Sequence, residues 1–236
     1  MSAAIAPRLN SLDWEEIGQA LDRDGYALTP TLLDSSECTK VIDSYDDDSL
    51  FRSHIVMSRF GFGRGEYKYF AYPLPQVVSE LREQFYPHLA LIANRWAKGI
   101  GGTVYPRSHG QFLESCHAAG QTKPTPLLLR YEPGDFNCLH QDLYGDLAFP
   151  FQLTFFLSRR EVDYSGGEFV LVEQRPRMQS RATVITAEQG QAVIFPTRYR
   201  AVQGTRGTYR ANLRHGVSPL KSGKRFTLGV IFHDAK

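Results

Sequence analysis

Apolar residues recur at helical spacing through the first half of the chain. Residues 11–24 open with a capping signal and then repeat apolar side chains every three or four positions, which predicts an amphipathic helix. Another helix is predicted to begin at Asp34, and a further one to cover residues 107–120. The longest periodic segment, residues 76–98, contains Pro87, which is expected to kink this helix or to begin a new one.

Two segments within this helical half, residues 52–59 and 66–70, have the composition of strands. The sequence Gly-Phe-Gly-Arg-Gly lies between them, at residues 61–65. Its glycine spacing differs from that of a phosphate-binding loop, and no helical pattern follows directly. We therefore predict a hairpin turn at this position.

From residue 127 onward the pattern changes to short apolar segments separated by Gly, Pro and Asp, which is typical of a sandwich or barrel. We expect one domain, residues 1–236, with an all-β core and helical elaboration (α+β). Its core would be a double-stranded β-helix, the cupin-like jelly roll, over residues 127–236, supported by helices and strands of residues 1–126. The predicted strands cover residues 127–131, 149–158, 167–173, 183–186, 191–196, 212–217 and 225–232.

Composition narrows the class of protein further. With 236 residues and 42% apolar residues the chain can bury a sizeable core, and its net charge of +2 gives no overall attraction to polyanions or membranes. The three cysteines lack paired spacing, the first ten residues lack the apolar run of a secretory signal, and no stretch is apolar enough for a transmembrane helix. A soluble, cytoplasmic protein without membrane partners is therefore expected.

Candidate chemistry is concentrated in His140-Gln141-Asp142 and in His215, which belongs to a separate predicted strand. Residues two apart in an extended segment project to the same face, so His140 and Asp142 can bind one metal ion from a single strand end. A neighbouring strand of a jelly roll would bring His215 alongside. Two imidazoles and one carboxylate are the ligands of a facial-triad ferrous site with open coordination positions. We therefore predict that all three residues are metal ligands and catalytic.

Other interpretations stay open from these residues alone. A lone His-x-Asp occurs by chance, and a buried histidine is more often a hydrogen-bonded core residue than a ligand. Zinc hydrolysis also uses two histidines and a carboxylate, and a cupin-like barrel could bind a metal or ligand without turnover. The co-occurrence of His140-x-Asp142 with His215 and with Arg225 on the last strand favours iron. Cys138 is interpreted as a packed strand cysteine.

Residues 127–236 resemble the Fe(II)- and 2-oxoglutarate-dependent oxygenase superfamily. The sequence Arg-Tyr-Glu-Pro-Gly-Asp at residues 130–135, running into His140-x-Asp142, is similar to the stretch before the metal motif in the AlkB group of nucleic-acid demethylases. Ser-Gly-Gly-Glu at residues 165–168 and the segment 215–227 are closer to the prolyl hydroxylase-like branch. The resemblance implies a dioxygenase with Fe(II), 2-oxoglutarate and O2, which forms succinate and CO2 and hydroxylates a substrate carbon.

The resemblance also assigns residues to the co-substrate. Arg225 stands where the family has an arginine that meets the far carboxylate of 2-oxoglutarate, and a guanidinium offers a fork of donors that matches a carboxylate. Thr227 lies two residues on, hence on the same strand face, and could add a hydroxyl donor. Tyr131 matches a tyrosine that hydrogen-bonds the co-substrate in the AlkB group. The apolar residues after Arg225 argue against an ordinary surface arginine.

The prime substrate stays open between two classes. The AlkB-like segment suggests alkylated nucleic acid, whereas the prolyl hydroxylase-like segments suggest a protein or a free amino acid. Residues 175–214 contain eight arginines and a single acidic residue, Glu188, which could form a phosphate-facing patch or only a solvated surface. The arginines of this group are Arg175, Arg177, Arg181, Arg198, Arg200, Arg206, Arg210 and Arg214.

Overall fold

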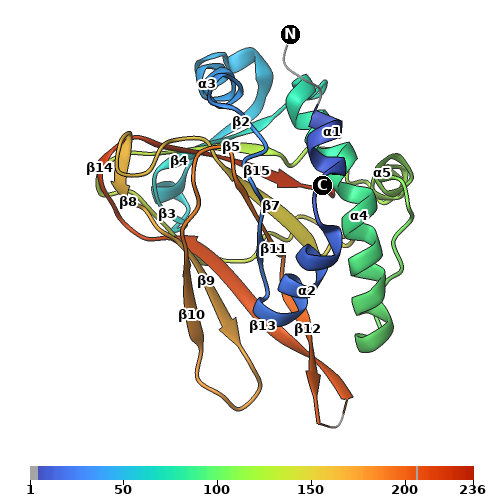
Figure 1. The fold of residues 1–236 in the computed structure, drawn as a ribbon. Coiled ribbons are helices and arrows are strands. Elements are labelled where there is room, and N and C mark those ends of the chain that lie inside the picture. Colours follow the sequence, from blue (N-terminus) through green and yellow to red (C-terminus); the bar gives the residue numbers. More distant parts are fainter. Residues whose placement is uncertain (1–4, 206) are drawn as a thin grey trace.

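Two facing antiparallel β-sheets form the centre of the molecule, with helices on one side (Figure 1). The structure, a computed structural model, describes residues 5–205 and 207–236. The helices pack against the outer face of the larger sheet and share one apolar core with it. This arrangement is the all-β core with helical elaboration that the sequence predicts.

The helices begin where capping residues stand. The Asp13 carboxylate accepts two backbone hydrogen bonds at the start of α2, and Asp34 forms a capping box with Glu37 at the start of α3. Helix α4 continues through Pro87, so no new helix begins there. No helix formed by the described residues is long and apolar enough to cross a membrane. The helices are α1 (Ile5–Asn10), α2 (Trp14–Asp24), α3 (Ser35–Asp43), α4 (Gln76–Ile100) and α5 (His109–Ala118), with 3-10 turns η1 (Ser44–Asp46), η2 (Asp48–Leu50) and η3 (Met57–Arg59).

The larger sheet has the strand order β1-β11-β7-β15-β5-β4-β2. Side chains alternate between its faces, so Leu228 and Val230 of β15 join the core under the helices, while Arg225 and Thr227 face the other way into a cavity. The two faces of one strand thus serve packing and chemistry separately. Its strands are β1 (Ala27–Leu28), β2 (Phe51–Val56), β4 (Glu66–Phe70), β5 (Leu127–Tyr131), β7 (Phe151–Phe156), β11 (Ala192–Pro196) and β15 (Arg225–Ile231).

The smaller sheet has the order β10-β9-β13-β6-β3, and β12 also pairs with the long strand β13. A second apolar cluster, which includes Phe156, Phe169 and Phe195, fills part of the space between the two sheets. The open remainder of that space is the cavity. The strands are β3 (Gly63–Arg64), β6 (Phe136–His140), β9 (Phe169–Gln174), β10 (Arg181–Ile185), β12 (Tyr199–Gly204) and β13 (Gly207–Val217), and a separate pair is formed by β8 (Tyr164–Gly166) and β14 (Leu220–Gly223).

Candidate active site

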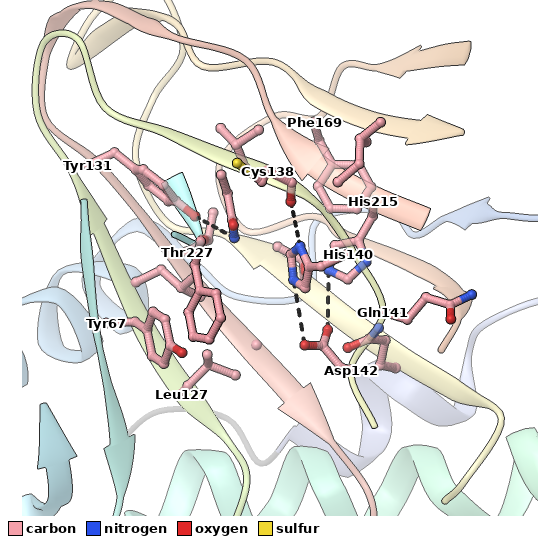
Figure 2. A pocket seen from close by; sticks show the side chains of 18 of the residues that line it. Tyr67, Leu127, Tyr131, Cys138, His140, Gln141, Asp142, Phe169, His215 and Thr227 are labelled. Atoms are coloured by element: carbon pink, nitrogen blue, oxygen red, sulfur yellow. Dashed lines mark hydrogen bonds and ion pairs between the residues drawn. The ribbon is translucent and has the colours of Figure 1, made fainter. Parts of the chain in front are cut away.

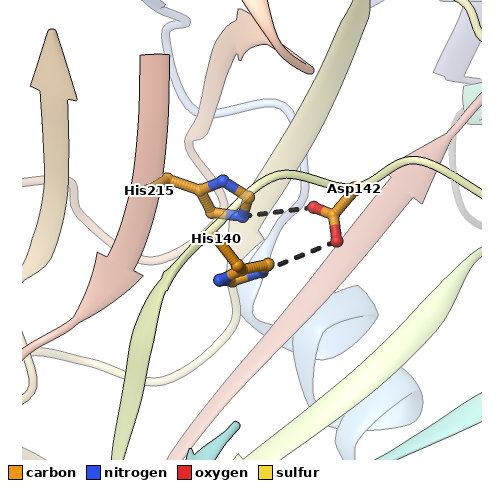
Figure 3. Close-up of side chains that lie close together, drawn as sticks. All are labelled: His140, Asp142 and His215. Atoms are coloured by element: carbon orange, nitrogen blue, oxygen red, sulfur yellow. Dashed lines mark ion pairs between the residues drawn. The ribbon is translucent and has the colours of Figure 1, made fainter. Parts of the chain in front are cut away.

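The three predicted ligands converge on one point between the sheets (Figures 2 and 3). His140 ends β6 and pairs directly with His215 of β13, so two adjacent antiparallel strands place the imidazoles side by side with ring centroids 4.2 Å apart. Asp142 follows β6, and its carboxylate oxygens lie 3.5 Å from Nε2 of His140 and 3.2 Å from Nε2 of His215. One potential ligand atom from each residue lies within 4.8 Å of the others.

Hydrogen bonds and charge leave these atoms in the forms that bind metal ions. Nδ1 of His140 lies 2.7 Å from the Cys138 carbonyl and donates to it, and Nε2 of the same ring is turned toward Asp142. Burial opposes the charge on Asp142, but the hydrogen bond from His215 and the nearby imidazoles hold the pKa of Asp142 well below its ordinary value. Burial, followed by the charge of His140, lowers the pKa of His215. The set thus offers two imidazole nitrogens and one carboxylate.

The local backbone around the triad is held by two features. The Gln141 side-chain amide donates to the carbonyls of Arg198 and Leu213 at 2.9 and 2.8 Å, which ties the segment between His140 and Asp142 to the neighbouring strand. Beside it, the pairing of β13 with β6 shifts register after His215, and a Cβ atom at Gly216 would come within 2.6 Å of a backbone oxygen of β6. Only glycine fits this close approach.

Tyr144 is a residue that the sequence reasoning missed. Its hydroxyl donates a hydrogen bond of 2.7 Å to Oδ1 of Asp142. Burial and the adjacent carboxylate raise the pKa of Tyr144 well above its ordinary value, so the hydroxyl keeps its proton and stays a donor. Tyr144 therefore orients the carboxylate, a role that supporting groups commonly play around metal ligands. The spacing of two residues after Asp142 was the available signal, but the segment lies outside regular strands.

We expect Tyr144→Phe to weaken binding of Mn(II) or Fe(II) by about 10-fold, because the carboxylate loses the bond that orients it. Calorimetric titration of the protein with Mn(II) measures this change. Tyr105→Phe is the matched control, since it removes a tyrosine hydrogen bond of 2.9 Å to the Ala148 carbonyl, which lies outside the triad. Equal metal affinities of the wild type and Tyr144→Phe would refute the orienting role.

Arg225 lies in the same cavity as the triad and is 1% exposed. All three guanidinium nitrogens are buried and lack a hydrogen-bond partner among the residues that the structure describes. The rings of Tyr131, Phe156 and Tyr164 surround the guanidinium at 5.4 to 5.9 Å. Gly167, in the predicted Ser-Gly-Gly-Glu segment, has a positive φ, and a Cβ there would come within 3.1 Å of the arginine side chain. A buried cation without a partner is costly, so this site is suited to an anionic ligand.

The other two predicted co-substrate residues also line this cavity (Figure 2). Thr227 and Tyr131 are buried on neighbouring strands of the larger sheet, in the registers that bring them beside Arg225. Burial raises the pKa of Tyr131 to about 12. The Tyr131 hydroxyl accepts a hydrogen bond of 3.4 Å from Asn137, a residue that was not predicted from the sequence to belong to the site. The cavity has a volume of about 310 Å³, within the size range of small-molecule sites.

Two sequence interpretations are corrected. Cys138 is exposed at the cavity, so its interpretation as a packed strand cysteine is wrong. The arginine group of residues 175–214 is not one phosphate-facing patch. Arg200 is buried in an ion pair with Glu173, which also pairs with Arg175 and Arg181, and Arg210 donates to carbonyls at the end of α4. Among the described arginines of the group, the exposed side chains without an ion-pair partner are Arg177, Arg198, Arg210 and Arg214, while Arg206 lies outside the described residues.

Solved structures share the fold. A prolyl-4-hydroxylase of Pseudomonas putida matches with a TM-score of 0.53 at 13% identity, over 94% of this chain and 99% of that chain. A prolyl 4-hydroxylase of Phytophthora capsici matches with a TM-score of 0.57 at 14% identity, over 98% of this chain and 66% of that chain. A 2OG-Fe(II) oxygenase family protein of Burkholderia pseudomallei matches with a TM-score of 0.52 at 14% identity, over 96% and 94% of the two chains. The fold is therefore the double-stranded β-helix of these oxygenases, as the sequence predicts.

Sequence relatives narrow the class to a family. Residues 65–235 match a family described as "Oxygenase, catalysing oxidative methylation of damaged DNA". An uncharacterized protein of Mycobacterium tuberculosis, found in two strains, is 49% identical over 167 residues, which are 70% of this chain and 72% of that protein. The chain belongs to this oxygenase family. Together with the fold and the donor set, this makes the protein an Fe(II)- and 2-oxoglutarate-dependent dioxygenase that uses O2.

Proposed function

We propose that His140, Asp142 and His215 bind the Fe(II) ion, and that Arg225 binds the far carboxylate of 2-oxoglutarate. One observation carries this proposal: the three-residue donor set lines the same cavity as a buried guanidinium that has no partner among the described residues. Two imidazoles and a carboxylate fit a ferrous ion with open positions, and a guanidinium fork fits a carboxylate. A zinc hydrolase site would leave the buried guanidinium of Arg225 unexplained.

The protein side chains have distinct tasks in this site. Bound iron would supply the oxidising chemistry, in which O2 and 2-oxoglutarate are consumed and a substrate C–H bond is hydroxylated. Arg225 fixes the co-substrate by its distal end, with the hydroxyl groups of Thr227 and Tyr131 as further donors. Tyr144 and the Cys138 carbonyl fix the directions of the ligand atoms. The buried aromatic rings around Arg225 exclude water and strengthen its attraction for an anion.

We further infer that the prime substrate is alkylated nucleic acid, and that hydroxylation of an N-alkyl carbon releases an aldehyde. The family description, which names damaged DNA, favours this class over a protein or free amino acid. The sequence identity to the two prolyl 4-hydroxylases is only 13% to 14%, so that similarity indicates a common fold and not a common substrate. The exposed residues Arg59 and Arg64, which flank Gly61 and Phe62 at the cavity, supply the positive charge that a phosphate backbone requires.

Coupled product formation tests the substrate class. The iron-loaded protein should form succinate and formaldehyde in equal amounts when it is given 2-oxoglutarate and single-stranded DNA that contains N-methylated bases. Unmethylated DNA of the same sequence should give succinate at no more than the rate without DNA. Stimulation of succinate formation by proline-containing peptides, with no response to methylated DNA, would contradict the inference and favour the protein-substrate class.

A further inference from the structure

Exposed apolar side chains gather around the mouth of the cavity. Phe62 and Leu139 line the cavity although they are 47% and 45% exposed, and Phe60, close to Phe62, is 57% exposed. Exposed apolar side chains on a protein are normally scattered, and a group of them beside a pocket marks a binding surface. The mouth of this cavity therefore has the character of a contact surface.

The turn that carries Phe60 and Phe62 is held firmly. Both amides donate to the carbonyl of Met57, which is fully buried, at 3.1 Å. The Phe62 carbonyl accepts a hydrogen bond of 2.9 Å from the Cys138 amide. The two rings stack on each other with centroids 5.6 Å apart and planes inclined by 22°. Because the backbone fixes the pair toward solvent, little conformational entropy is lost when another flat ring stacks on it.

Two arginines flank these rings. Arg59 precedes Phe60 and is exposed, without an ion-pair partner among the described residues. Arg64 follows Phe62 by two residues and is 63% exposed, with Asp135 at the outer limit of an ion pair, 4.0 Å. We call residues 59–64 the aromatic turn. Cations beside solvent-facing aromatic rings are the combination by which proteins bind single-stranded nucleic acids, through phosphates and stacked bases.

The cavity below the aromatic turn continues along a wall of tyrosines. Tyr69 contacts Tyr67 and Tyr144 edge-on, with ring centroids 5.3 and 6.0 Å apart. The same cavity reaches Gln152, which is 3% exposed and whose side-chain Nε2 has no hydrogen-bond partner in the described part of the chain. A buried amide donor without a partner is costly and indicates a ligand that carries an acceptor.

Gln152 lies too far from Arg225 to share the co-substrate. It pairs with Ile231, at the opposite end of β15 from Arg225, so the two positions are separated by roughly 20 Å along the strand. The carboxyl carbons of a five-carbon dicarboxylic acid are only about 5 Å apart. The Gln152 amide is therefore available to a second ligand that enters from the mouth of the cavity.

We propose that the aromatic turn binds single-stranded nucleic acid, with a base stacked on Phe60 and phosphates on Arg59 and Arg64, and that the neighbouring base enters the tyrosine-lined cavity, where the Gln152 amide donates to a ring acceptor. The interleaving of cations with flat exposed rings favours a nucleic-acid strand over a peptide. This inference rests on the proposed function, because it identifies how the substrate of that reaction is held.

Binding of a fluorescent single-stranded DNA of about 15 nucleotides, measured by anisotropy with Mn(II) and 2-oxoglutarate present, tests the aromatic turn. Phe60→Ala should weaken binding by about 10-fold or more, because one stacking partner is lost. Arg59→Ala should weaken binding and reduce the slope of log affinity against log salt by about one. Matched controls are Leu91→Ala, at a side chain that is also 57% exposed, and Arg107→Ala, at an exposed arginine two residues before α5.

Either of two outcomes would overturn the proposal. One is wild-type affinity in both Phe60→Ala and Arg59→Ala. The other is tighter binding of a proline-rich peptide than of DNA, with that binding lost in Phe60→Ala. Retained melting temperatures show that the variants fold. Because the assay needs no turnover, failure here leaves succinate formation from 2-oxoglutarate intact, whereas failure of the proposed function would appear as loss of that reaction in the wild type.

Gln152→Leu tests the inner part of the site. The wild type should bind a strand with a single N-methylated base more tightly than the unmodified strand, and the variant should lose this preference while it keeps affinity for the unmodified strand. The expected loss is about 5- to 10-fold, the usual effect of one hydrogen bond to a buried donor. An unchanged preference in Gln152→Leu would place base recognition elsewhere and contradict this part of the proposal.

Discussion

His140→Ala, Asp142→Ala and His215→Ala each lose iron-dependent turnover of 2-oxoglutarate by more than about 100-fold, because each removes one of three converging ligand atoms. Succinate formation measures turnover, and metal analysis of the purified variants should show a parallel loss of bound iron. The direction of the effect is the same for all three, since no other His, Cys, Asp or Glu among the described residues joins this cluster.

The matched controls for the triad use residues of the same types elsewhere. His54→Ala removes a 46% exposed histidine that pairs with Glu66, and Asp146→Ala removes a 79% exposed aspartate. Both should retain iron and turnover. Full turnover in all three triad variants, with iron content unchanged, would rule out the assignment of these ligands.

Arg225→Met raises the KM for 2-oxoglutarate by at least about 30-fold, because the co-substrate loses a buried charge-assisted pair. The same variant should melt, without ligands, at a temperature equal to or above that of the wild type, since methionine replaces a buried cation that has no hydrogen-bond partner among the described residues. Opposite effects on binding and on stability distinguish a ligand-binding arginine from a structural one.

Arg200→Met is the matched control for Arg225. Both arginines are 1% exposed, but Arg200 is paired with Glu173 and donates to the Asp22 carbonyl. Its loss leaves a buried carboxylate short of a partner and should destabilise the fold by about 3 kcal/mol or more, without a change in KM for 2-oxoglutarate. A lowered melting temperature and an unchanged KM in Arg225→Met would mean that Arg225, too, is structural.

The convergence of His140, Asp142 and His215 could be predicted because its geometry is local. Residues two apart at a strand end project to the same face, so the sequence alone places the side chains of His140 and Asp142 side by side. Only the position of His215 depends on the fold, through the pairing of β6 with β13. Strand periodicity similarly located β7, β9, β11 and β15 to within a few residues. The sequence predicts that Pro87 either kinks the longest helix or begins a new one. The second alternative is wrong, because packing of α4 against the sheet outweighs the cost of one proline.

Features that depend on contacts distant in the sequence were not predictable. The strand β12 was missed, and β13 begins five residues earlier than expected, because its pairing with β12 stabilises polar residues without clear alternation. The sequence indicated that the arginines near residue 200 could form a phosphate-facing patch. In the folded protein, Arg200 instead forms an ion pair with Glu173, which lies on another strand. Tyr144 and Gln152 line one cavity between the two sheets, and the sequence pattern alone does not show that they lie there.

Crystals of the protein soaked with Mn(II) and 2-oxoglutarate would show directly whether the triad binds the metal ion and Arg225 binds the co-substrate. The anomalous map should show a manganese peak roughly 2.0–2.3 Å from Nε2 of His140, Nε2 of His215 and a carboxylate oxygen of Asp142. The far carboxylate of 2-oxoglutarate should then lie on the Arg225 guanidinium. No manganese peak at the triad at a saturating concentration of Mn(II), or a metal ion bound elsewhere with the co-substrate distant from Arg225, would contradict the assignment of these residues.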